Sequence, residues 1–252
     1  MANEVVDVRD RVNRRQQLPE EVASYVRELI ISGAVKPGEF LRMERIAEQV
    51  GVSNTPVREG LLVLKSEGFV QLVPRRGFVV APFSQQDVRD LFWAQAQVAR
   101  ELAARAARKI TPEQVARLEA NVEELQKAVA AGDTERIADL GYAFHRQINL
   151  AADSRRLALL LGAVVNYLPN RFYASIEAQV AATSDEHPQL VKALREHDVR
   201  KARSLMEQHI LSSADHLIEI LEQRGLWAGR GADESVSGAP TNPAAARTFP
   251  LP

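Results

Sequence analysis

The sequence predicts a mostly α-helical protein with two parts: an N-terminal winged helix-turn-helix with a small β-hairpin wing, and an all-helical bundle. Residues 36–80 contain two short helical patterns followed by two strand patterns. Helical periodicity then continues almost without interruption to about residue 225. A chain of 252 residues with 46% hydrophobic content can bury a sizeable core in one or two domains.

Composition and periodicity divide the chain into four segments. Residues 1–17 are polar and are expected to form a flexible N-terminal segment. Residues 18–82 form the winged helix-turn-helix domain, and residues 83–225 form the helical domain, in which Ser84 and Thr111 are expected N-caps. Residues 226–252 are rich in Gly, Ala, Pro and Ser, so a disordered tail is expected.

The helix-turn-helix is predicted from local chemistry. Apolar residues at helical spacing indicate a first helix over about 42–50, and Gly51 ends it because glycine tolerates the left-handed conformation. Ser53 is placed to cap a second helix. The buried stripe of that helix consists of Val57, Leu61 and Leu64. Arg58 therefore points away from the core.

A basic loop follows these helices. Strand patterns at 69–73 and 78–80 flank Pro74, Arg75, Arg76 and Gly77, a loop that can lie along a phosphate backbone. The whole chain has a formal net charge of −1, and residues 35–82 contain seven basic and five acidic residues. Specific DNA binding would therefore depend on a few well-placed arginines.

At these residues the sequence resembles the GntR family of bacterial transcription regulators. The GVSNTPVRE core, the preceding AEQ, the SGAVKPGE segment and the LKSEGFV and RRGFVV segments match the family in order and spacing. The resemblance implies a DNA-binding regulator, mostly a repressor, that binds double-stranded DNA as a homodimer. Two-fold symmetry of the dimer requires an inverted-repeat operator.

The expected DNA contacts lie on the helices and the wing: Arg45, Ser53, Asn54, Thr55, Arg58, Arg75, Arg76 and Gly77. Arginines supply the main cationic contacts, and the hydroxyls of Ser53 and Thr55 lie near a helix N-terminus that favours phosphate. Alternatively, Arg58 pairs with Glu59 or Glu28 on the surface. The family commonly has arginine at positions 44 and 54, where this sequence has Glu44 and Asn54.

Asn54 bears on the operator sequence. Asparagine pairs with adenine through N6 and N7, whereas arginine reads guanine. We therefore expect an A·T pair opposite Asn54, unless this side chain contacts phosphate or helps to cap its helix.

Three histidines form a second constellation. His145, His187 and His209 lie on or beside the apolar stripes of three helices. Imidazoles that converge in a bundle interior suit a divalent metal such as zinc or nickel. Histidines on an apolar face can instead be hydrogen-bonded core residues.

Residues from about 85 to 222 look like the effector-binding FCD domain of the FadR-type branch of the GntR family. The matching segments are AFHRQI, EHPQLVKAL and MEQHI. The resemblance implies that His145, His187 and His209 ligate a metal together with an Asp or Asn one turn before the first histidine. This sequence has Gly141 there, and Asp139 lies on another face of the helix.

The resemblance also implies a small-molecule effector, such as an organic acid or a sugar acid. An ion held by three neutral imidazoles keeps its full charge, so an open coordination position would favour an anionic ligand. The arginine common in the first helix of such domains is missing from residues 95–99, which read QAQVA. Arg171 is a candidate replacement, although it can equally be a solvated charge.

Other classes of function are less well supported. A three-histidine site with an open position also holds catalytic zinc, but no partnered general base, nucleophile motif or phosphate loop accompanies these histidines, so no enzyme is expected. A constitutive repressor without effector remains an alternative. The absence of cysteine, of a signal peptide and of an apolar run long enough for a bilayer predicts a soluble cytoplasmic protein with no membrane partner.

Overall fold

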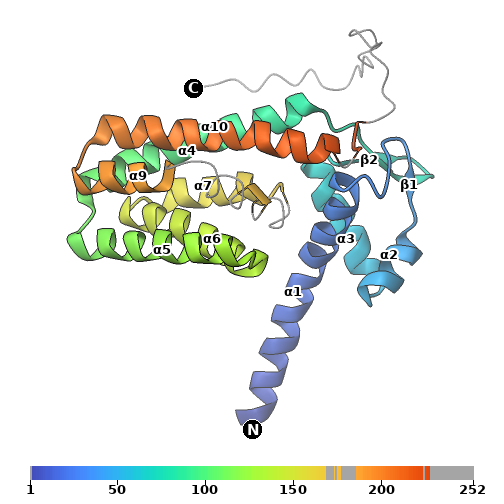
Figure 1. Ribbon diagram of the computed structural model, residues 1–252. Coiled ribbons are helices and arrows are strands. Elements are labelled where there is room, and N and C mark those ends of the chain that lie inside the picture. Colours follow the sequence, from blue (N-terminus) through green and yellow to red (C-terminus); the bar gives the residue numbers. More distant parts are fainter. Residues whose placement is uncertain (1, 169–172, 174, 177–185, 224, 228–252) are drawn as a thin grey trace, which may run out of the picture.

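The structure has the winged helix-turn-helix and helical domains that the sequence predicts (Figure 1). The computed structural model describes residues 2–168, 173, 175, 176, 186–223 and 225–227, with side chains from residue 17 onward. Among these residues, no helix is both long enough and apolar enough to cross a membrane.

Helix α1 spans Ala2–Ile31, so it begins earlier than the helix that the sequence predicts from residue 18. Residues 2–18 contain neither glycine nor proline, so nothing in them stops a helix from continuing upstream. The N-terminal half of α1 projects away from the body of the molecule (Figure 1). Its C-terminal half packs into the winged domain through Val22, Val26 and Ile30.

Helices α2 (Met43–Val50) and α3 (Asn54–Ser66) form the helix-turn-helix as expected. Gly51 ends α2 with φ of 75°, in the left-handed region. Gly60 of α3 lies against α1, where a Cβ atom would be only 2.6 Å from the Pro19 carbonyl oxygen. The backbones of α1 and α3 therefore meet at a point where a side chain larger than hydrogen does not fit.

The wing belongs to a three-stranded antiparallel sheet instead of an isolated hairpin. Strands β2 (Val70–Val73) and β3 (Gly77–Val80) form the expected hairpin. The additional strand β1 (Phe40–Leu41) pairs with β3, giving the order β1-β3-β2. Two residues are too few to show strand alternation in a sequence.

The helical domain contains α4 to α7, α9 and α10. Their bounds are α4 Gln85–Lys109, α5 Pro112–Ala131, α6 Thr134–Ala151, α7 Arg155–Val165, α9 Glu186–Arg195 and α10 Val199–Gln223. Ser84 and Thr111 cap α4 and α5 as expected, each in a capping box with the side chain three residues later.

The two domains share one hydrophobic core. Buried residues of α10, including Leu217 and Leu221, belong to the same cluster as Val22, Phe69 and Phe83 of the winged domain. Leu226 and Trp227, which the sequence analysis assigned to the tail, also pack against this cluster, and the Trp227 indole donates to the Phe83 carbonyl at 2.7 Å. The rest of the expected tail lies outside the described residues.

Candidate functional site

The first turn of α3 exposes polar side chains. Ser53 occupies the N-cap position with an extended backbone, but its side chain makes no capping hydrogen bond. Ser53, Asn54 and Thr55 are exposed, as is Arg58 one turn further along, whereas Val57, Leu61 and Leu64 are buried. The surface that α3 turns to solvent therefore carries hydroxyl, amide and guanidinium groups near a helix N-terminus.

Arg58 is available for an external partner. It forms no hydrogen bond or ion pair with any residue of the described part of the chain, so the alternative pairing with Glu59 or Glu28 is not formed. A guanidinium without a partner carries its charge to the surface, where phosphate or a guanine edge can accept its hydrogen bonds.

Arg45 lies in a different environment. Together with Gln49 of α2 and Arg42, the residue before that helix, it lines a pocket of about 470 Å³ between α1, β1 and α2. Glu44, its neighbour on the helix, is exposed. Arg45 is exposed as well, but its position in this pocket distinguishes it from the residues of the α3 surface.

The wing holds its two arginines differently. Arg75 is exposed and adopts φ of 62°, a left-handed conformation that non-glycine residues adopt only in tight turns. The Arg76 guanidinium lies 4.5 Å from the centre of the Phe40 ring, in a cation–π contact. Gly77, with φ of 101°, begins β3. Arg75 is thus the less constrained cation of the two.

A buried ion pair fixes the orientation of α3, and the sequence analysis missed it. Arg27 of α1, only 3% exposed, donates to both carboxylate oxygens of Glu67 just after α3, with distances of 2.8–3.1 Å. Burial raises the pKa of Glu67, an effect that the hydrogen bonds from Arg27 oppose. Removing one partner of such a pair costs about 3–5 kcal/mol because the other charge stays buried.

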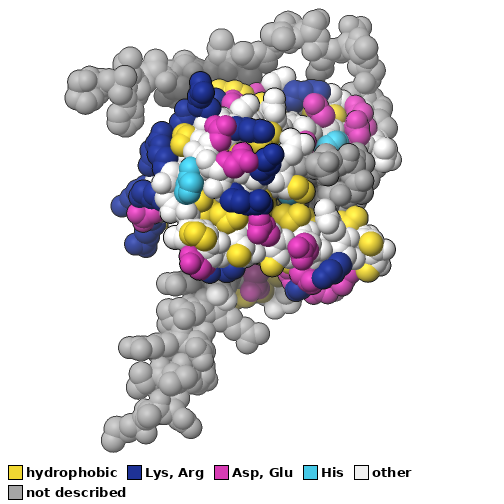
Figure 2. Space-filling model, turned by 60° about the vertical axis from the view of Figure 1, so that its left-hand side comes forward, with side chains coloured by type: hydrophobic (Ala, Val, Ile, Leu, Met, Phe, Trp, Pro, Cys, Tyr) yellow, Lys and Arg dark blue, Asp and Glu magenta, His cyan; other side chains and the backbone are white. Residues whose placement is uncertain are grey.

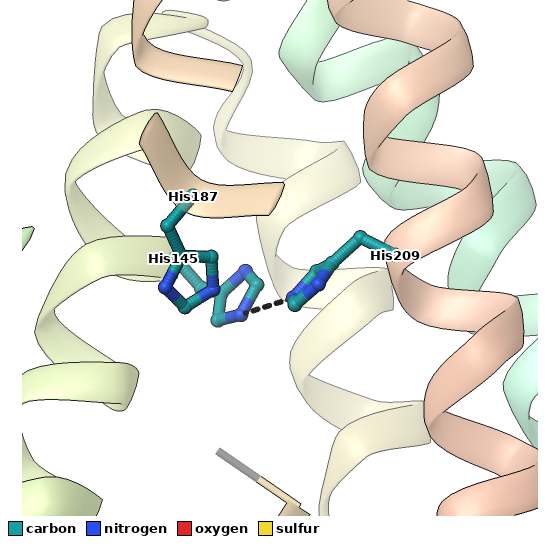
Figure 3. A group of neighbouring side chains, drawn as sticks. All are labelled: His145, His187 and His209. Carbon is teal, nitrogen blue, oxygen red and sulfur yellow. Dashed lines mark hydrogen bonds between the residues drawn. The ribbon is translucent and has the colours of Figure 1, made fainter. Parts of the chain in front are cut away.

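The three histidines converge, as Figure 3 shows. His145 comes from α6, His187 from α9 and His209 from α10, and one ring nitrogen of each lies within 4.8 Å of those of the other two. His187 and His209 are 4% and 2% exposed. The Nε2 atoms of His145 and His209 are 3.3 Å apart. Phe144 stacks on the His187 ring, with centroids 4.2 Å apart.

This donor set fits a divalent metal ion. Two nitrogens bound at about 2.0–2.1 Å to one tetrahedral ion lie roughly 3.3 Å apart, which is the separation found between His145 and His209. Imidazole nitrogens suit zinc, nickel and copper. Gly141, one turn before His145, is buried and offers no donor, and Asp139 is exposed. Within the described residues, the cluster therefore supplies three neutral ligands.

Glu186 adds a carboxylate that the sequence analysis did not identify. Its Oε2 accepts a hydrogen bond from Nδ1 of His209 at 2.7 Å, and this bond holds the pKa of Glu186 below its usual value. The sequence shows no partnered general base beside these histidines, whereas the structure places the Glu186 carboxylate in a hydrogen bond with one of them. Glu186 precedes His187 in the sequence, but its partner lies 23 residues away on α10. Arg171, the candidate effector contact, lies outside the described residues.

The helical domain does not present a surface of uniform charge at the end seen in Figure 2. Basic and acidic side chains lie next to one another there, with hydrophobic side chains between them. Alternating charges favour solvation over binding of a polyanion. The side chains predicted to contact DNA lie instead on α2, α3 and the wing.

Comparisons with known proteins match both parts of the chain. Residues 18–80 match the family model of bacterial regulatory proteins of the gntR family, and residues 90–212 match that of the FCD domain. The transcriptional regulator McbR of Escherichia coli is 29% identical over 189 residues, 71% of this chain and 84% of McbR. The transcriptional repressor RspR of Escherichia coli is 23% identical over 222 residues, 87% of this chain and 97% of RspR.

Solved structures agree in fold. The structure of Escherichia coli McbR/YncC matches with a TM-score of 0.59 and 26% identity, covering 82% of this chain and 98% of that one. A putative GntR transcriptional regulator from Rhodococcus matches with a TM-score of 0.52 and 19% identity, covering 80% and 97% of the two chains. These relatives are named as transcription regulators, and none of them as an enzyme.

Proposed function

The chain belongs to the GntR family of bacterial transcription regulators and has a C-terminal FCD domain, and on this basis we propose that it is a repressor controlled by a small anionic metabolite. In this proposal a homodimer binds an inverted-repeat operator in the cytoplasm, and the metabolite binds in the helical domain and changes operator affinity. The observation that carries the proposal is that one chain contains both an exposed polar surface on α3 and a cluster of converging histidines.

The α3 surface supports recognition of duplex DNA. Ser53, Asn54, Thr55 and Arg58 are exposed together at the start of the second helix of a helix-turn-helix, the part that enters the major groove in such motifs. The exposure of Arg75 in the turn of the wing supports a contact with phosphate. Arg76, stacked on Phe40, has less freedom to reach the backbone and is a secondary contact. Arg45 and Gly77 complete the proposed set of contacts.

The histidine cluster supports binding of a divalent metal, zinc or nickel, by His145, His187 and His209. A bound ion would supply Lewis acidity that attracts a ligand oxygen. Among the described residues no carboxylate joins the three histidines as a ligand, and Gly141 stands where the family commonly has Asp or Asn. A carboxylate of an organic acid can fill this position, which is why the proposed effector is anionic.

The long helices α4 and α10 support dimerisation. They run antiparallel, and several polar pairs cross between them, among them Arg89–Asp215, Gln97–Glu207 and Glu101–Arg203. The same register sets Trp93 opposite Leu211, and these side chains are 60% and 37% exposed. An apolar pair with polar rims is the usual anatomy of an interface, and we propose that a second copy of this chain covers it.

Operator binding measured with and without metal and organic acids tests this function. Selection from random duplexes first identifies an operator, and its affinity is then measured for protein freed of metal, protein with zinc or nickel, and metal-loaded protein with a panel of small carboxylic acids. The proposal expects a changed affinity with at least one acid, only in metal-loaded protein. A tight operator complex that no acid and no metal affects would instead identify a constitutive repressor.

A further inference from the structure

Glu186 occupies a special position beside the histidine cluster. It is the first residue of α9, and its carboxylate crosses to α10, where Oε2 lies 2.7 Å from Nδ1 of His209. The His209 side chain is 3% exposed and the Glu186 side chain 32% exposed. We propose that Glu186 is a positioning residue for the metal site, which holds His209 in its metal-binding tautomer before any metal arrives. This inference rests on the metal site proposed above.

The hydrogen bond fixes where the proton of His209 lies. A carboxylate only accepts, so Nδ1 of His209 must carry the hydrogen, and Nε2 of the neutral ring is then the nitrogen with the free lone pair. Nε2 is also the atom that faces His145 in the cluster (Figure 3). Carboxylate–histidine pairs of this kind orient metal ligands in many sites and raise their basicity.

His145 takes the complementary form. Its Nε2 lies 3.3 Å from Nε2 of His209, and two ring nitrogens attract each other only when one of them carries a hydrogen. Because Glu186 assigns the hydrogen of His209 to Nδ1, the hydrogen between the two rings belongs to His145. A metal ion would replace that hydrogen. We therefore expect His145 to change tautomer on metal binding and His209 to keep its tautomer.

Gly141 gives Glu186 a second role in this chain. With no carboxylate one turn before His145, the three direct ligands leave the charge of a divalent ion uncompensated. Glu186 brings one negative charge to the far side of His209, close enough to act through the ring but not in the ligand position. The coordination position toward the effector stays open, while part of the ionic charge is balanced.

The tautomers can be read in the metal-free protein. Long-range proton–nitrogen spectra of ¹⁵N-histidine-labelled protein, stripped with a chelator and held at about pH 8, distinguish the two neutral forms of each ring. The wild type should show His209 with its hydrogen on Nδ1, and Glu186→Ala should lose this form. Glu186→Gln, which keeps an accepting oxygen, should retain it. Because no metal is present, this readout does not depend on whether the protein binds metal.

Metal affinity provides the second readout. By chelator competition with zinc, Glu186→Ala should weaken binding by about 10–100-fold, the usual effect of losing such a partner, and Glu186→Gln by less. Glu207→Gln is the matched control, because it removes a carboxylate of α10 that is bonded to Arg100 and not to a histidine. Glu207→Gln should leave both tautomer and affinity unchanged.

Two results would overturn the inference. One is a wild-type His209 with its hydrogen on Nε2; the other is an unaltered His209 tautomer in folded Glu186→Ala. If wild-type protein binds no zinc or nickel but shows the expected His209 tautomer that depends on Glu186, the proposed metal site fails, whereas the control of the His209 tautomer by Glu186 stands.

Discussion

Replacing Arg58 with alanine tests the DNA-binding surface most directly. Arg58 is exposed and has no partner among the described residues, so its loss leaves no buried charge and breaks no contact that holds α3. The stability of the protein should change by less than about 0.5 kcal/mol, as for an ordinary surface substitution. Any loss of operator affinity can then be attributed to a contact with DNA.

The expected loss follows from one arginine per half-site. An arginine that contacts a base or a phosphate contributes about 1–3 kcal/mol, and a two-fold dimer loses two such contacts, or about 2–6 kcal/mol in all. This corresponds to a weakening of operator binding by roughly 30-fold to 10⁴-fold. Fluorescence anisotropy with a labelled operator, repeated at several salt concentrations, measures both the affinity and its dependence on salt.

The salt dependence separates the two kinds of contact. If Arg58 binds phosphate, the slope of log affinity against log salt should fall by about 0.9 for each copy lost, whereas a base contact should relax sequence preference with little change in slope. Lys65→Ala is the matched control, because Lys65 is an exposed cation in the last turn of the same helix. Equal affinity of folded Arg58→Ala and wild type would refute this role for α3.

Further predictions concern the metal, the operator and the dimer. His187→Ala or His209→Ala should remove bound zinc or nickel, as elemental analysis measures, and should abolish the rise in melting temperature on addition of metal. Untagged wild-type protein that contains no metal, and whose melting temperature does not rise when zinc or nickel is added, would contradict this prediction. Asn54→Arg should shift one operator position from A·T toward G·C in a binding selection, by about 1–3 kcal/mol, and an unchanged preference there would leave Asn54 as a phosphate or capping residue. Trp93→Glu should give monomers in sedimentation experiments, whereas the control Leu150→Glu, at an exposed position of α6, should not. A stable Trp93→Glu dimer would place the interface elsewhere.

Local chemistry explains why much of the fold was predictable. Gly51 ends α2, and Ser84 begins α4, because each acts on backbone atoms within a few residues of itself. The buried stripe of α3 follows from spacing alone. The sequence predicted that three histidines converge, from apolar stripes on three helices together with the family resemblance. In the structure, one ring nitrogen of each lies within 4.8 Å of those of the other two.

Long-range pairing explains what the sequence did not show. Arg27 and Glu67 are 40 residues apart, and nothing in their local patterns connects them. Glu186 lies within a matched segment, beside His187, yet the ring it contacts is on another helix. Strand β1 exists because β3 offers it an edge, since two residues have no strand pattern of their own. Such features depend on which helices and strands pack against one another, and the periodicity of the sequence does not determine that packing.

The same packing connects the histidine cluster to the DNA-binding domain. Helix α10 is continuous from His209 to Leu221, a length of about 18 Å, and Leu221 belongs to the core shared with the winged domain. Tyr167, which follows α7 in the helical domain, also packs against Phe69, with 6.3 Å between the ring centroids, just before β2 of the wing. A ligand that shifts His209 would therefore displace a helix whose far end lies in the core shared with the winged domain. Packed cores move between discrete arrangements and do not deform smoothly. A small shift at the histidine cluster would therefore change the packing between the helical domain and the winged domain.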